Sequence, residues 1–114
     1  MKQEIEIIRG TTNPIQIHVT DRSNGEPYTL ADGEKIVFGV KKRPEHDECV
    51  LKKIITELTD GVCTVEIKPE DTESLPFGKY SFDVGLLSEK DYYSVIPPSV
   101  FHVRENITKR GDGA

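Results

Sequence analysis

The stretch PEDTESLPFGKYSFDVGLL, residues 69–87, contains the two local patterns that decide the fold of this chain. It begins with a proline and acidic residues and is interrupted at Pro76 and Gly78, which is typical of a single helical turn near 69–75. Apolar side chains then occupy every second position from Tyr80 to Leu86, which is the period of a half-buried strand. We therefore expect a strand at 79–87, entered from a helical turn too short to be stable alone.

The same period of two recurs along the chain, with a less regular phase near 50–56 and 92–96. Besides 79–87, the expected strands are 3–8, 14–20, 34–42, 50–56, 62–68 and 91–104. The turn at 59–61 predicts a hairpin between strands 50–56 and 62–68, in which Cys63 would face Thr56. Because Pro97 and Pro98 cannot donate ladder hydrogen bonds, the last strand is expected either to lie at a sheet edge or to carry a bulge there.

Short strands at this spacing predict an all-β protein, and specifically an immunoglobulin-like β-sandwich of about seven antiparallel strands. Gly78–Phe82 resembles the start of strand F in immunoglobulin domains, where a tyrosine two residues before a disulfide cysteine bonds the backbone upstream. Tyr80 matches that tyrosine and Phe82 stands in place of the cysteine, so we expect core packing to replace the disulfide. The alternative fold is a small barrel such as an OB-fold, which would need five longer strands and usually a longer helix.

Length and charge limit the classes of function. The 114 residues allow one domain, assigned to 1–107, before a Gly-rich tail at 108–114 that we expect to be disordered. The formal net charge of −5 argues against a nucleic-acid partner. No apolar run reaches the ~18 residues of a membrane span, and the acidic N-terminus is no secretory signal, so we expect no membrane partner and no signal-directed secretion. Cys49 and Cys63 are expected to be free thiols in a reducing compartment.

We expect no catalytic residues, no cofactor and no metal site, and therefore no enzyme. Gly-rich phosphate loops and the H-E-x-x-H, paired C-x-x-C and G-x-S-x-G motifs do not occur in the sequence. Residues 46–49 offer four types of metal donor in a row, but consecutive residues of an extended chain point to opposite sides. The tripeptide Arg110-Gly111-Asp112 matches an integrin-binding motif, and we interpret it as a chance occurrence in the tail.

Three blocks of sequence carry a resemblance to a known family: residues 26–42, 65–84 and 99–103. They resemble the small immunoglobulin-like domains of tailed-phage and prophage structural proteins, and are similar to the N-terminal domain of siphophage baseplate upper proteins. The resemblance implies a non-enzymatic structural role in a phage tail or baseplate, with other virion proteins as partners. It also implies a location in the virion or, before assembly, in the cytoplasm of the bacterial host. The alternative function is a bacterial surface or carbohydrate-binding immunoglobulin-like adhesion module.

The last expected strand is the most apolar candidate for contacts between proteins, including self-association. The first strand, in contrast, carries Glu4 and Glu6 on its outer phase, and these charges protect its edge from pairing. The predicted interaction surface consists of Leu87, Tyr92, Tyr93, Val95 and Ile96. The alternative is that these residues complete the core of the domain itself.

Overall fold

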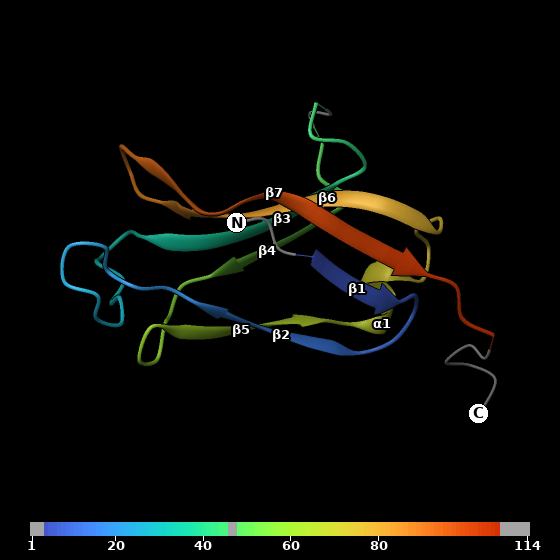
Figure 1. Cartoon of the computed structure of the whole chain (residues 1–114), viewed down its shortest axis with the longest axis horizontal. Coiled ribbons are helices and arrows are strands. Elements are labelled where there is room, and N and C mark those ends of the chain that lie inside the picture. Colours follow the sequence, from blue (N-terminus) through green and yellow to red (C-terminus); the bar gives the residue numbers. More distant parts are fainter. Residues whose placement is uncertain (1–3, 46–47, 108–114) are drawn as a thin grey trace.

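The computed structural model describes residues 4–45 and 48–107, which form two sheets and one helical turn (Figure 1). The elements are β1 (Glu4–Ile8), β2 (Asn13–His18), β3 (Lys35–Lys41), β4 (Leu51–Ile55), β5 (Val62–Ile67), α1 (Pro69–Thr72), β6 (Gly78–Leu87) and β7 (Tyr92–Arg104). The all-β prediction is confirmed, and every expected strand occurs within two residues of its expected bounds. The expected tail at 108–114, with its Arg110-Gly111-Asp112 motif, and His46 and Asp47 lie outside the described residues.

The larger sheet has the strand order β1-β7-β6-β3-β4, and the smaller sheet pairs β2 with β5. β1 runs parallel to β7, with Glu4 beside Val100 and Ile8 beside Arg104. The prediction that all strands are antiparallel is therefore wrong for this pair. Alternation of apolar residues determines which side chains face the core, but it contains no information about the direction of the neighbouring strand.

The predicted hairpin between residues 50–56 and 62–68 is also wrong. β4 pairs with β3 in the larger sheet, whereas β5 pairs with β2, so that Cys63 faces Ile17 instead of Thr56. The turn at 59–61 closes only a local bridge between Thr59 and Val62. The chain crosses from the larger sheet to the smaller one between β4 and this turn. In this arrangement β4 and β5 both bury their apolar side chains in the common core.

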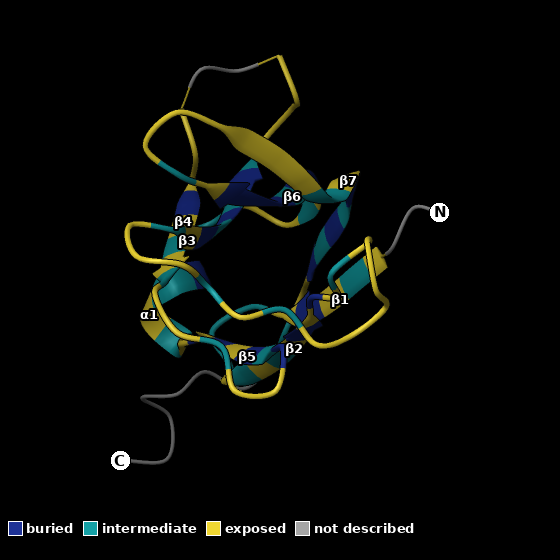
Figure 2. Ribbon diagram, turned by 90° about the vertical axis from the view of Figure 1, so that its left-hand side faces the viewer, coloured by how far each residue is buried: buried dark blue, intermediate teal, exposed yellow. Residues whose placement is uncertain are grey.

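The buried residues form one core, to which strands of both sheets contribute (Figure 2). Its centre is formed by Phe38, Phe82 and Phe101, whose ring centroids lie 5.6–6.3 Å apart. Phe82, at the position of the immunoglobulin cysteine, is only 2% exposed, as expected if core packing replaces the disulfide. Both cysteines are free thiols, with Cys63 buried and Cys49 exposed.

At the end of the domain that carries α1, side-chain contacts connect separate elements of the fold. The Tyr80 hydroxyl donates a 2.6 Å hydrogen bond to the Pro76 carbonyl, which confirms the upstream backbone bond expected for this tyrosine. Asp71 accepts a bond from the Lys68 amide at 2.8 Å and forms a 2.7 Å ion pair with Lys53 of β4. The helical turn predicted at 69–75 is confirmed by α1 and the turn that follows it, and it links both sheets.

β7 changes its register against β6 twice between Ser94 and Ser99. One extra residue falls at Val95, and a second falls within Pro97-Pro98, where the sequence predicts a bulge or an edge. Among the described residues, β1 pairs with residues 100–104 of β7, and no described strand pairs with the half of β7 before them on that side. In the part of the chain described, no helix is long and apolar enough to cross a membrane.

Candidate functional site

A cleft of about 780 Å³ opens at the end of the domain that carries the 19–34 loop and the β6–β7 hairpin (Figure 1). One wall is formed by residues 18–22, from the last residue of β2 onward, and the other by Tyr93–Val95 of β7. Tyr28 and Glu34 of the 19–34 loop also line the cleft. Its volume lies within the range of ~300–1,000 Å³ that is usual for ligand pockets.

The wall after β2 is fixed by backbone contacts. The Val19 amide donates to the Gly61 carbonyl at 2.7 Å, and the Tyr28 amide donates to the Val19 carbonyl at 3.0 Å. Gly61 has a φ of +75°, and a Cβ at this position would lie 2.6 Å from the Val19 carbonyl oxygen. Only glycine fits here, so the turn at 59–61 holds the base of the cleft wall in place.

The loop side of the cleft carries negative charge that is already hydrogen bonded. One Glu34 oxygen accepts both the Tyr28 hydroxyl at 2.8 Å and the Ala31 amide at 2.7 Å. The bond to Glu34, with burial and the nearby carboxylates, raises the pKa of Tyr28 to about 12. Bonds from the hydroxyl and amide of Ser23 lower the pKa of Asp21, which therefore stays ionised at neutral pH.

The cleft presents phenols, hydroxyls and three carboxylates, those of Asp21, Glu34 and Asp91. Two of the carboxylates are engaged in bonds that shape the loop. Among the described residues, no group of three or more His, Cys, Asp or Glu side chains is arranged to hold a metal ion.

The structure divides the predicted interaction surface into two parts. Leu87, Tyr92 and Tyr93 are exposed, with exposed fractions of 40%, 56% and 57%. Leu87 and Tyr92 are directly opposite each other in the β6–β7 pairing, whereas Tyr93 contributes to the cleft. Val95 and Ile96 are half-buried and pack against the core, as the alternative interpretation expects for those two residues. Binding of a partner by the exposed part stays a prediction.

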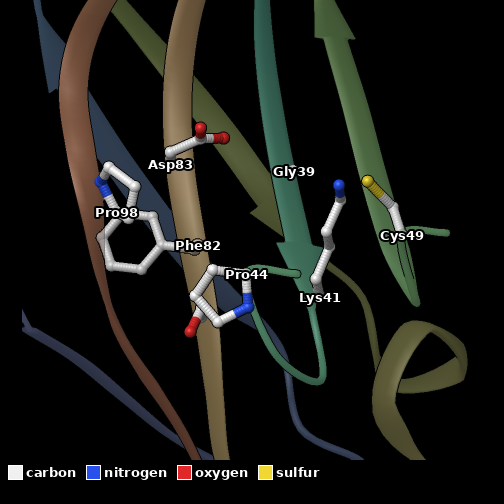
Figure 3. Close-up of a pocket in the computed structure, with 8 residues that line it drawn as sticks. Gly39, Lys41, Pro44, Cys49, Phe82, Asp83 and Pro98 are labelled. Atoms are coloured by element: carbon white, nitrogen blue, oxygen red, sulfur yellow. The ribbon is translucent and has the colours of Figure 1, made fainter. Parts of the chain in front are cut away.

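Sequence reasoning did not find a second, smaller pocket of about 90 Å³ on the outer face of the larger sheet (Figure 3). Asp83 of β6 lies between Pro98 of β7 and Gly39 of β3, and Cys49 lies on the far side of Gly39. Nearby, the Tyr92 ring covers the outer face of Gly85. The ring lies so close that a Cβ atom at residue 85 would overlap it. The sequence signal is a glycine on the outward phase of both β3 and β6.

The Tyr92 ring is therefore less open than its position near a hairpin turn suggests. Burial, followed by electrostatic interaction with Asp83 and Cys49, raises the pKa of the Tyr92 phenol. The phenol stays neutral at physiological pH and can act as both donor and acceptor of hydrogen bonds. Tyr92 thus presents one ring edge to solvent while the other packs on the sheet.

Comparison with known proteins gives no family assignment. The chain matches no family model, no curated protein sequence and no solved structure. The resemblance to immunoglobulin-like domains of phage structural proteins stays an expectation based on the sequence blocks quoted above.

Proposed function

We propose that this chain is a non-enzymatic structural module of a tailed phage or prophage, associated with the tail or baseplate, that works through protein–protein contacts. The fold assignment within this proposal is an immunoglobulin-like sandwich. The pairing of β2 with β5 corresponds to strands B and E of that fold, and the order β7-β6-β3 corresponds to G, F and C. β4 then takes the position of strand C′, which variable-type domains add beside strand C.

The tyrosine at the start of β6 supports the same fold assignment. In immunoglobulin domains a tyrosine near the start of strand F bonds the backbone a few residues upstream. Tyr80 occupies the third position of β6, and its hydroxyl bonds the carbonyl four residues earlier, at Pro76. The hydroxyl of a buried tyrosine needs a hydrogen-bond partner in any fold, so the specific point of agreement is that this partner is the upstream backbone carbonyl.

The observation that carries the functional proposal is the exposed aromatic end of the larger sheet. Tyr92, Tyr93 and Leu87 are large side chains with exposed apolar surface on the β6–β7 hairpin. Aromatic side chains are enriched where proteins contact one another, because they bury a large area with few rotatable bonds. The carboxylates beside them are held by loop hydrogen bonds, which supports recognition over catalysis.

The test is to locate the protein in assembled particles. Tailed particles are purified from an induced lysogen, and their components are quantified by mass spectrometry together with antibody labelling of the tail. We expect the chain at a fixed ratio to known tail components. Recovery of the chain only from the cell envelope, with none in the particles, would contradict the proposal. An enzyme would be shown by substrate turnover, in a broad hydrolase screen, that disappears on Asp91→Asn.

A carbohydrate-binding adhesion module is the second candidate function. The cleft favours it, because Tyr28 and Tyr93 both line a pocket of suitable volume and aromatic rings can stack on sugar rings. A glycan array on the full chain, followed by titration of any hit against Tyr93→Ala, tests this function. Saturable sugar binding that the substitution abolishes would favour adhesion over virion structure. Ile54→Ala, on the exposed outer face of β4, serves as the control.

A further inference from the structure

Half of β7 has an open hydrogen-bonding edge. β1 covers Val100–Arg104, whereas Tyr92–Ile96 pairs with β6 alone among the residues that the structure describes. The Ser88 amide donates to the Asp91 carbonyl at 2.9 Å, so these two residues form a hydrogen-bonded pair beside the turn. Alternation along an antiparallel ladder then turns the backbone groups of Tyr93 toward β6. The N–H and C=O groups of Tyr92 and Ser94 consequently point away from β6, toward the cleft side.

This edge lacks the protection found on the terminal strands of the same sheet. β1 carries Glu4 and Glu6 on exposed positions, and β4 carries Lys52 outward and Lys53 inward. Charged side chains of this kind prevent a sheet from pairing with another chain. Tyr92–Ile96 contains no charged residue, and it is limited instead by the β6–β7 turn on one side and by two prolines on the other. Any added strand is therefore confined to this short stretch.

We propose that this edge binds an extended peptide segment of another protein that carries lysine or arginine, and that the segment adds to the larger sheet as a strand. The backbone of the peptide pairs with the outward N–H and C=O groups of Tyr92 and Ser94. The inference rests on the proposed function, because it names the chemistry of the partner that the exposed hairpin would contact. The bulge at Val95 lies beyond Ser94 and leaves these groups on the regular part of the strand.

The negative charge of the cleft favours a peptide with positively charged side chains. The cleft beside the edge is lined by the carboxylates of Asp21, Glu34 and Asp91, against the single guanidinium of Arg22 and the imidazole of His18. The whole chain carries a net charge of −5, which disfavours a second copy as the occupant and attracts a cation. The rings of Tyr28 and Tyr93 line the same cleft and can receive an ammonium or guanidinium group over their faces.

The probe is the peptide acetyl-Thr-Lys-Val-Lys-Val-amide, added to the isotope-labelled full chain and followed by NMR. We expect shifts confined to β7 and the cleft, and slower hydrogen exchange of the Tyr92 and Ser94 amides. The twin peptide with Glu in place of Lys should not bind. No shift at about 10 mM peptide, ten times a dissociation constant of about 1 mM, would overturn the inference.

Three variants test the contact groups. Ser94→Pro removes an N–H that points away from β6, so it should abolish peptide binding and leave the fold intact. Asp91→Asn should weaken binding about two- to fivefold, as expected for one exposed charge pair. Glu89→Gln makes the same kind of change on the same turn but outside the cleft lining, and should have no effect. Equal effects of Asp91→Asn and Glu89→Gln would overturn the role of the cleft carboxylates in binding the peptide.

Three further outcomes separate this inference from its alternatives. A dimer of the full chain in sedimentation, dissociated by Ser94→Pro, would assign the edge to a second copy and overturn the inference. If the chain is a tail component but the peptide does not bind, strand addition fails and the proposed function stands. If the peptide binds but the chain is missing from the particles, the proposed function fails and the inference of peptide binding at the edge stands.

Discussion

Replacing Phe82 with alanine tests the phase of β6 and the position of the core together. The ring is 2% exposed and contacts Phe38 at 5.6 Å and Phe101 at 6.3 Å between centroids. Deleting a fully buried phenylalanine costs about 3–5 kcal/mol of unfolding free energy. Each aromatic pair lost adds about 0.5–1.5 kcal/mol beyond buried area, so we expect the upper half of that range.

The matched control is Phe77→Ala, at an exposed phenylalanine on the loop before β6. Phe77 is 43% exposed, and the Arg9 guanidinium lies 4.1 Å from its ring centroid. An exposed cation–π contact is worth about 0.5–1 kcal/mol, so this variant should lose no more than that. Urea unfolding followed by circular dichroism measures both variants, and Phe82→Leu replaces Phe82→Ala if the latter does not fold. A loss below about 1 kcal/mol for Phe82→Ala, or equal losses at the two sites, would refute the assignment of the core.

Three further predictions concern the contacts at the ends of the sandwich. Tyr80→Phe should lower the unfolding free energy by about 0.5–1.5 kcal/mol in urea titrations, since it removes one hydrogen bond. Burial raises the pKa of Asp71, but the hydrogen bonds from Lys53 and the Lys68 amide, together with the two lysine charges, outweigh burial and lower the pKa. The wild-type chain should therefore be more stable than Asp71→Asn by its full margin above about pH 4, and this margin should shrink as the pH falls further. Gly61→Ala should lower the thermal midpoint more than Gly33→Ala, which has open space and should cost only about 1–2 kcal/mol.

The strands could be predicted from the sequence because apolar and polar residues alternate cleanly along most of them. The bounds of β6, and the helical turn before it, follow from residues that are neighbours in the chain. The neighbours of β1 and β4 could not be predicted, since any strand with the right apolar phase can complete the same core. The position of β4 beside β3 is decided by packing across the whole sandwich and not by the turn at 59–61.

The candidate site could be predicted only in part, for a similar reason. The exposed Leu87, Tyr92 and Tyr93 lie next to one another near a turn, so the sequence alone identifies them as a surface candidate. The cleft could not be predicted, because its two walls come from 18–22 and 93–95, which are distant in the chain. The packing of the Tyr92 ring on Gly85 leaves only a weak signal in the sequence, which is a glycine inside an otherwise regular strand.

The parallel pairing of β1 with β7 has a mechanical consequence. Glu4 lies beside Val100 and Ile8 beside Arg104, so the β1 and β7 ends that lead out of this strand pair point in opposite directions. Tension applied between Glu4 and Arg104 would pull the two strands past each other along their length. Every backbone bond of that ladder, and the 3.2 Å ion pair between Arg104 and Glu6, would then bear load at the same time. A module loaded in shear in this way resists extension better than one whose strands are peeled apart one bond at a time, which suits a part that must stay folded while its neighbours move.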